Sequence, residues 1–577
     1  MKNLFCQFLP NQGLSHRPSV LSRRTGFLTG FLASAIAAFP AALPAQSAER
    51  IQFFFGPFEP TIYVDDLETF ATTGEVPERF EIVANRLNDQ QKSQLRAALN
   101  AHSELSPIPI SQFTYSPFGE NLLDKLGQVI QTDSFLNGMK GIRAALILAA
   151  SDEANGGFST LNVLRHFPTD TIQIDFSLAR QIVAENERIY SDRDRVIAEI
   201  KQTAQAQAIV PMSKANLAAD KNPMSAGPYT WTTQTITFQT PGRPQSSLAD
   251  LYLPQASSAA AETNAVPVVV ISHGVASSRK TFQYMAEHLA SHGYGVVSLE
   301  HVDTSAEKFV RFLWGKEGPP SPQDLLLRPQ DITAALDFLT QQQASDPALA
   351  RLSLSSVGVL GQSLGGYTVL AAGGAEIDPL FLGQECESSL AERPSLNISL
   401  LLQCTLLELP ANTPLEVADE RVGAIISLNP LTSSIFGRSG LQKIDVPVML
   451  MAGTNDFVTP ALPEQIEPFD WLEAPHKTLV VMENGTHFSF LDRETRSVLP
   501  FSDGLTGPDP LQARGATQAL SLAFFNRHLL NDSEADAFLN QAYLNEWPTG
   551  PFEFSLVTES SVINAAGINE SDINTGK

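Results

Sequence analysis

The sequence predicts an α/β fold in which helices cover both faces of a mostly parallel sheet, preceded by a mostly helical domain. From Thr230 onward, short apolar runs of strand length alternate with helical patterns, which is typical of a buried parallel sheet. Between residues 64 and 206 the patterns are almost all helical. With 577 residues the chain has room for two or more domains and a large core.

Residues 1–47 resemble an export signal. Basic residues, among them Arg23 and Arg24, precede an apolar stretch at 26–43 that small residues follow. This order is typical of a cleaved signal peptide, although the run is also just long enough for an uncleaved anchor. Its alanines and Pro40 favour cleavage, so we expect a periplasmic or secreted protein without a stable transmembrane span. The arginine pair is close to a twin-arginine signal.

Residues 48–207 are predicted to form a helical accessory domain of unknown function. Residues 51–64 alternate as a strand or an edge ribbon would. The predicted helices are 64–72, 77–87, 90–99, 121–131, 141–150 and 176–206. The segment carries no paired ligands, phosphate loop or nucleophile motif, which favours packing on the next domain over an activity of its own. Residues 208–228 are rich in Pro, Ala, Asn and Ser and are predicted to be a linker.

The catalytic domain is predicted to span residues 229–550, with 551–577 as a fraying tail. Its eight predicted strands are 232–238, 249–253, 266–271, 295–299, 357–360, 422–428, 446–451 and 478–482. Two stretches, 302–328 and 376–421, are longer than connections need to be. Long excursions from the carboxyl edge of such a sheet commonly form lids and substrate walls.

The candidate nucleophile is Ser363. It stands in Gly-Gln-Ser-Leu-Gly at 361–365, directly after an apolar strand and directly before a helix of small residues. The flanking glycines allow the sharp, strained turn that exposes a serine hydroxyl at the carboxyl edge of a sheet. Eight strands with the nucleophile after the fifth match the plan of the α/β-hydrolase fold. An inert serine in a glycine-rich turn is the alternative.

The candidate base is His487. Only His476, His487 and His528 follow Ser363 in the chain, and His487 alone lies in a loop after a predicted strand. His476 precedes a predicted strand and His528 lies within a predicted helix, so we expect both side chains to point away from Ser363. Chain order and position at a strand end therefore favour His487 over an ordinary surface or core histidine.

The candidate acid is Asp456, which lies just past the carboxyl end of the predicted strand 446–451. The other aspartates between the nucleophile and the base are Asp378, Asp419, Asp445 and Asp470. Asp419 and Asp445 enter strands from the amino side and cannot reach the site. A turn-capping role is the alternative for Asp456.

An oxyanion intermediate needs two backbone N–H donors. We expect one from Leu364, immediately after the nucleophile, and one from Val275, in the loop after the third predicted strand. Gly274 permits close approach of this loop, and His273 is expected to be a structural residue rather than a second base. The predicted chemistry requires no metal and no organic cofactor.

The cysteines indicate the compartment of the protein, and the net charge limits its classes of partner. Cys6 lies inside the predicted signal, which leaves Cys386 and Cys404 for a disulfide in an oxidising compartment, or for two buried thiols. Neither cysteine fits a zinc pattern. The net charge is -24 with no long basic run, which argues against nucleic acid or an anionic membrane surface as a partner.

The chain from residue 266 to 487 resembles the α/β-hydrolase branch of the plasma-type platelet-activating-factor acetylhydrolases and the serine relatives of dienelactone hydrolase. The matching motifs are Ser-His-Gly at 272–274, Leu-Ala-Ser-His-Gly-Tyr at 289–294, Glu-His at 300–301 and Gly-Gln-Ser-Leu-Gly-Gly at 361–366. The resemblance implies calcium-independent hydrolysis of carboxylic esters, with short acyl groups and oxidised phospholipids among the substrate classes.

Two features depart from these families. The acetylhydrolases place the acid after the sixth strand, where this chain has Ser-Leu-Asn-Pro at 427–430 and no carboxylate. Dienelactone hydrolases are similar in sheet but use a cysteine nucleophile. The amino-terminal segment resembles an uncharacterised domain found ahead of hydrolases in exported bacterial proteins, which implies no activity.

The sequence thus predicts an exported serine esterase that acts on short-chain or lipid-type esters, with a role in lipid catabolism. Phe309, Phe312 and Trp314 in the first insertion favour an apolar acyl or aryl group. A thioesterase or peptidase with the same triad remains open, as does an inactive hydrolase-fold scaffold whose helical domain recruits a partner. The physiological substrate, the oligomeric state and any protein partner are not identified by the sequence.

Overall fold

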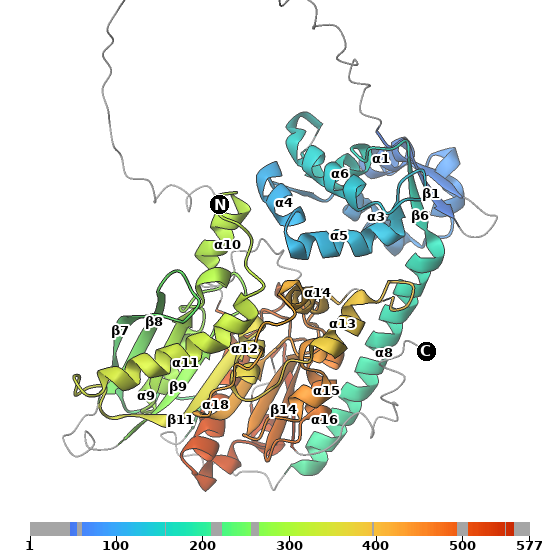
Figure 1. The fold of residues 1–577 in the computed structure, drawn as a ribbon. Helices are drawn as coiled ribbons and strands as arrows, with labels where there is room; N and C mark the ends of the chain where they lie inside the picture. The colour runs from blue at the N-terminus through green and yellow to red at the C-terminus, as the bar shows by residue number, and fades with distance from the viewer. Residues whose placement is uncertain are drawn as a thin grey trace, which may run out of the picture. The chain divides into compact units, whose positions relative to one another are not determined.

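A nine-stranded sheet forms the centre of the protein (Figure 1). The computed structural model describes residues 47–54, 60–155, 157–208, 222–255, 265–394, 397–492, 506–547 and 550–558. The strand order is β15-β14-β13-β12-β11-β9-β10-β8-β7. The strands are β7 (Thr230–Phe238), β8 (Ser247–Gln255), β9 (Val266–Ser272), β10 (Gly295–Glu300), β11 (Leu352–Gln362), β12 (Val422–Leu428), β13 (Val448–Gly453), β14 (Lys477–Glu483) and β15 (Glu553–Thr558). This architecture confirms the predicted α/β-hydrolase fold.

The six central strands are parallel and the three outer strands are antiparallel. β11 pairs in parallel with β9 and β12, so that Leu360 lies opposite Ile271 on one side and Ile426 on the other. β8 pairs antiparallel with both β10 and β7, and β15 pairs antiparallel with β14. The carboxyl ends of the parallel strands therefore meet at one edge of the sheet, where a site is expected.

The ninth strand, β15, corrects the prediction of eight strands and a fraying tail from residue 551. Its six residues pair with β14 from Thr478 opposite Thr558 to Glu483 opposite Glu553. This pairing satisfies the otherwise open edge of β14, which is why the segment is ordered as a strand.

Helices cover both faces of the sheet with separate apolar clusters. Along β9, Val268 and Val270 belong to one cluster, whereas Val269 and Ile271 belong to the other. The helices of this domain are α9 (Gln283–Ser291), α10 (Ala306–Leu313), α11 (Asp324–Gln342), α12 (Leu364–Ala372), α13 (Pro379–Glu387), α14 (Ile398–Cys404), α15 (Ser433–Leu441), α16 (Glu467–Trp471), α18 (Leu511–Leu529) and α19 (Gln541–Asn545). Burial on both faces explains why the central strands read as continuous apolar runs.

The accessory domain combines helices with a small sheet of order β2-β1-β6-β4. Its strands are β1 (Arg50–Phe54), β2 (Thr61–Tyr63), β4 (Ile130–Gln131) and β6 (Thr171–Asp175), with a separate pair of β3 (His102–Ser103) and β5 (Phe158–Ser159). Its helices are α1 (Val64–Thr73), α2 (Glu81–Ala84), α3 (Asp89–Leu99), α4 (Pro107–Thr114), α5 (Pro117–Val129), α6 (Met139–Ser151) and α7 (Thr160–Arg165). β1 lies between β2 and β6. Strands from the beginning and the end of the domain's sequence therefore pair with each other.

The long helix α8 (Phe176–Gln207) links the accessory domain to the sheet domain (Figure 1). It begins at Asp175, whose side chain accepts a hydrogen bond of 2.9 Å from the backbone N–H of Leu178. In its second half, Val196, Ile200 and Ala204 are fully buried in the same apolar cluster as the strands of the large sheet. Most of the predicted linker, like the predicted export signal up to residue 46, lies outside the described residues.

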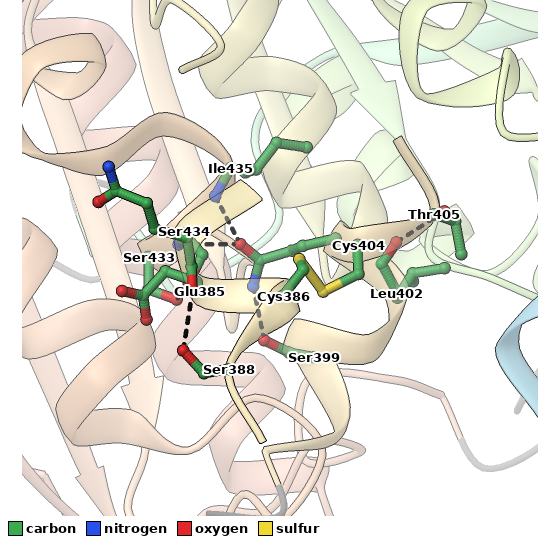
Figure 2. The surroundings of a disulfide bond; sticks show 12 residues. Glu385, Cys386, Ser388, Ser399, Leu402, Cys404, Thr405, Ser433, Ser434 and Ile435 are labelled. Atoms are coloured by element: carbon green, nitrogen blue, oxygen red, sulfur yellow. Dashed lines mark hydrogen bonds between the residues drawn. A yellow bond between two sulfur atoms is a disulfide. The ribbon is translucent and has the colours of Figure 1, made fainter. Parts of the chain in front are cut away.

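The second predicted insertion, 376–421, carries α13 and α14 and a disulfide between Cys386 and Cys404 (Figure 2). Beside it, Gln403 Oε1 accepts hydrogen bonds from the backbone N–H groups of Ser434 and Ile435. These contacts fasten the insertion to α15. No helix within the part of the chain that the structure describes is long and apolar enough to span a membrane.

Candidate active site

Ser363 lies on a strained turn between β11 and α12. Its backbone has φ 58° and ψ -122°, a conformation that L residues rarely adopt. The turn needs glycines on both sides, because a Cβ at Gly361 would meet the carbonyl oxygen of Gly365 at 2.1 Å and a Cβ at Gly365 would meet that of Ser272 at 2.1 Å. The geometry presents the hydroxyl at the carboxyl edge of the sheet, beside the N-terminus of a helix.

The structure brings Ser363, His487 and Asp456 into one hydrogen-bonded row. His487 Nε2 lies 2.9 Å from Ser363 Oγ, and His487 Nδ1 lies 2.7 Å from Asp456 Oδ2. The exposed fractions are 7% for Ser363 and 5% for each of the other two residues. In such a row the imidazole can accept the hydroxyl proton while the carboxylate stabilises the charged ring.

The carboxylate of Asp456 is held by its own loop. Its Oδ1 accepts hydrogen bonds of 2.8 Å from the backbone N–H groups of Val458 and Thr459, and its Oδ2 accepts one of 2.8 Å from Thr459 Oγ1. Thr459 was not predicted from the sequence. The signal that could have found it is an aspartate followed three residues later by a threonine, which is typical of a side-chain-capped turn.

The alternative residues lie elsewhere. The rings of His476 and His528 contact each other, with centroids 5.2 Å apart, rather than Ser363. Asp419 pairs with Arg421 at 2.7 Å, and Asp378 caps α13 by accepting from the backbone N–H of Phe381. Their positions leave Asp456 as the carboxylate that contacts His487.

Asn429, which follows β12, links the loops of Asp456 and His487. Its Nδ2 donates to the carbonyl oxygen of Thr486 at 3.2 Å, and its Oδ1 accepts from the backbone N–H of Gly453 at 2.9 Å. A positive φ of 42° is more tolerable for asparagine than for most side chains. Asn429 is therefore a structural link between the two loops, which the sequence pattern did not reveal.

The loop after β9 lies directly against the turn at Ser363. A Cβ at Gly274 would stand 3.2 Å from the Cβ of Ser363 and 2.8 Å from Oε1 of Gln362. Gln362 in turn donates from Nε2 to the carbonyl oxygen of His487 at 3.1 Å. Val275 directly follows Gly274 in this loop, and Leu364, the first residue of α12, directly follows the nucleophile.

His273 is buried in this loop as a structural residue. Its Nε2 accepts a hydrogen bond of 3.0 Å from the backbone N–H of His301, and its Nδ1 lies 2.7 Å from the carbonyl oxygen of Gly274. The fully buried guanidinium of Arg328 donates to the carbonyl oxygen of His273 and to Thr304 Oγ1. Burial lowers the pKa of Arg328 to about 10, which leaves it charged at neutral pH.

A buried ionic cluster is connected to the same loop through His301 and Ser272. Arg243 pairs with Asp331 at 2.7 Å and with Asp324 at 2.6 Å. Asp331 also contacts His301 Nδ1 at 2.7 Å, and His301 Nε2 lies 2.8 Å from Ser272 Oγ. The loop that lies against Ser363 is therefore fixed by charged and polar groups that no short motif brings together.

The buried histidines predict a loss of stability in mild acid. Burial is the main cause that lowers the pKa of His273 and His301 well below 6.5 and that of His288 to about 4. The unfolded chain takes up these protons below about pH 6.5 and the folded chain does not, so their stabilising contribution is present above that pH and is lost as the pH falls.

Each such group can remove about 1.4 kcal/mol of unfolding free energy per pH unit below 6.5. We expect the melting temperature, measured by circular dichroism, to fall between about pH 7 and about pH 5. His288→Leu should make the fall shallower, because unfolding would then take up about one proton fewer. A melting temperature that is constant or rises over this range would contradict the account.

The first insertion places aromatic side chains beside the loop after β9. Phe309 and Phe312 of α10 are buried and form one cluster with Ala276, against which Val275 also packs. Trp314 follows the helix and is 48% exposed. The loop after β9 is therefore packed against an apolar cluster of the first insertion.

A cavity of about 300 Å³ lies where the accessory domain, the second insertion and the sheet domain meet. Its apolar walls include Leu122 of α5, Ile189 of α8, Phe381 of α13, Leu401 of α14 and Trp471 of α16. None of the described residues that line it belongs to the row around Ser363.

In the described ranges, no three metal-ligating side chains gather to hold a metal ion.

Two family models match the chain. Residues 47–175 match a family described as alpha/beta hydrolase of unknown function (DUF1400). Residues 243–345 match platelet-activating factor acetylhydrolase, isoform II, a segment that begins at Arg243 and includes the loop after β9 but ends before Ser363. No curated protein matches the chain. The two matches confirm the resemblance inferred from the motifs and, with the fold, support a hydrolase of the esterase or lipase type.

Proposed function

We propose that this protein is a serine hydrolase that cleaves carboxylic esters through an acyl-enzyme. The observation that carries the proposal is the row Ser363–His487–Asp456 on a strained strand-to-helix turn, with contacts of 2.9 and 2.7 Å. A structural serine would not need the unfavourable backbone conformation that φ 58° represents. The fold, the turn and the row are mutually consistent with one reaction class.

In the proposed reaction, Ser363 Oγ attacks the ester carbonyl carbon as His487 Nε2 takes the hydroxyl proton. Asp456 holds the ring and stabilises its charged form. The N–H groups of Leu364 and Val275 bind the oxyanion, and loss of one such donor typically costs about 2.7–4 kcal/mol of transition-state stabilisation. The alcohol leaves with the proton from His487, and water then attacks the acyl-enzyme by the same route in reverse.

The substrate class is proposed from the apolar cluster beside Val275. Phe309 and Phe312 are buried beside the expected oxyanion loop and make its surroundings apolar, which favours short acyl, aryl or lipid-type esters over charged acyl groups. The match to the acetylhydrolase model over residues 243–345 supports the same class. The triad chemistry alone would equally serve a thioesterase or a peptidase.

We expect p-nitrophenyl esters to be cleaved with a clear chain-length preference, whereas matched anilides should be cleaved much more slowly. The measurement is kcat/KM for p-nitrophenyl esters of rising chain length, a short-acyl phospholipid, an acyl thioester and a p-nitroanilide. Preference for the anilide or the thioester would replace the esterase assignment with a peptidase or thioesterase. Well-folded protein that turns over none of them would favour a scaffold role.

Export to an oxidising compartment is also proposed. The order of basic, apolar and small residues in 1–47 supports it, and so does the disulfide between Cys386 and Cys404. Mass spectrometry of the mature amino terminus would test both the cleavage and its position.

A further inference from the structure

We infer that helix α8 of the accessory region positions the two loops that carry Asp456 and His487, with Arg193 as the positioning residue. The inference rests on the proposed function, because it assigns α8 a role in keeping the proposed acid and base in register. This role would give the accessory segment a function at the site of the hydrolase domain.

The second half of α8 is fixed in the core of the sheet domain. Val196, Ile200 and Ala204 follow each other at intervals of four residues on one face of the helix, and each is 0% exposed. A helix held by three fully buried side chains cannot slide or rotate without opening the core. Polar side chains on the neighbouring part of α8 are therefore presented to the sheet domain at fixed positions.

Arg193 lies on this part of the helix, one turn before Val196, and reaches the acid loop. Its Nη1 donates a hydrogen bond of 2.8 Å to the carbonyl oxygen of Thr454, two residues before Asp456. The Arg193 side chain is 18% exposed, and its guanidinium lies 4.8 Å from the centroid of the Tyr190 ring. A partly desolvated, charged donor makes a stronger hydrogen bond than a neutral one.

The acceptor of Arg193 lies where the acid loop and the base loop join. The backbone N–H of Asn455 donates to the carbonyl oxygen of Gly485 at 2.7 Å, and the backbone N–H of Asn484 donates to Thr454 Oγ1 at 3.0 Å. Gly485 is two residues before His487. A displacement of Thr454 would therefore move both loops and change the distances within the row.

A second contact lies two turns further along α8. Lys201 Nζ pairs with Glu483 Oε1 at 3.2 Å and with Glu553 Oε1 at 2.7 Å. Glu483 is the last residue of β14, directly before the loop of His487. Because Lys201 is 41% exposed, this pair is expected to contribute less than Arg193.

Removal of the Arg193 donor should lower kcat without a matching change in KM. The row is made by hydrogen bonds of 2.7–2.9 Å, and a misplacement of about 1 Å at a reacting centre can cost about a hundredfold in rate. We expect about a tenfold lower kcat for Arg193→Ala in the full chain, with KM for p-nitrophenyl acetate changed by less than about twofold. Arg193→Lys retains a cationic donor and should restore part of the loss.

The matched control is Arg195→Ala. Arg195 lies two residues away on the same helix, is 57% exposed, and pairs with Asp192 of α8 rather than with the sheet domain. It should keep the wild-type kcat. Active-site titration with a fluorophosphonate would normalise each rate to the fraction of competent protein, so that misfolding is not counted as a lower kcat.

Equal normalised kcat values for Arg193→Ala and Arg195→Ala would overturn the inference while leaving the esterase proposal intact. A KM that changes by as large a factor as kcat in Arg193→Ala would also contradict a positioning role. So would an Arg193→Lys protein whose kcat is no higher than that of Arg193→Ala. Wild-type protein without ester turnover would overturn the proposed function, and the positioning role with it.

Discussion

Ser363→Ala should lower ester hydrolysis by about four to six orders of magnitude. The substitution removes the only atom that the row around His487 is arranged to activate, Ser363 Oγ at 2.9 Å. Alanine tolerates the φ of 58° no worse than serine does, so the turn and the fold should be retained. The measurement is the initial rate with p-nitrophenyl acetate, alongside circular dichroism of the folded protein.

The matched control for this variant is Ser355→Ala, an exposed serine on the same strand, β11. It should keep the wild-type rate within experimental error. A Ser363→Ala protein that retains more than about a tenth of the wild-type kcat would show that another group is the nucleophile.

Asp456→Asn should lower kcat by about three to four orders of magnitude with little change in fold. The backbone N–H groups of Val458 and Thr459 donate to Oδ1, so the amide oxygen of asparagine would remain on that side. Its NH₂ group would then face His487 Nδ1 and require that nitrogen to accept. The ring would carry its proton on Nε2 and could no longer accept one from Ser363.

Asp445→Asn is the control, because Asp445 is exposed and precedes β13 on the amino side of the sheet. The measurement is kcat with a p-nitrophenyl ester as a function of pH for both variants. Near-normal turnover by Asp456→Asn would mean that a different carboxylate orients the imidazole.

Local patterns in the sequence were sufficient for the six parallel strands β9 to β14, because both faces of those strands are mostly buried. The runs at 266–271 and 422–428, for example, correspond to β9 and β12. β15 could not be recognised in this way. Its six residues gain their order from pairing with β14, more than sixty residues earlier in the chain, and a short alternating segment carries no sign of its partner.

The small sheet of the accessory domain shows the same limit. β1 overlaps the start of the predicted strand or ribbon, but its parallel partner β6 has five residues and lies more than a hundred positions later. The strand precedes a strong helix signal at Asp175, which dominates the local pattern. Pairing between the two ends of the domain is a property of its folded state rather than of either segment.

At the candidate site, chain order and position at strand ends sufficed to select Ser363, Asp456 and His487, which the structure brings together. Residues that contact the loops around these three residues were not predicted from the sequence. Arg328 reaches the carbonyl oxygen of His273 from α11, and Arg193 reaches that of Thr454 from the accessory region. Such contacts depend on which backbone oxygen a side chain reaches, which spacing along the sequence does not encode.

The most direct test of the central claim is the site of covalent labelling by a fluorophosphonate, mapped by peptide mass spectrometry. We predict a single adduct on Ser363 in the wild-type protein and a labelling rate reduced by at least about a hundredfold in folded His487→Ala. An adduct on another residue, or equally fast labelling of Ser363 without the imidazole, would contradict activation of this hydroxyl by His487.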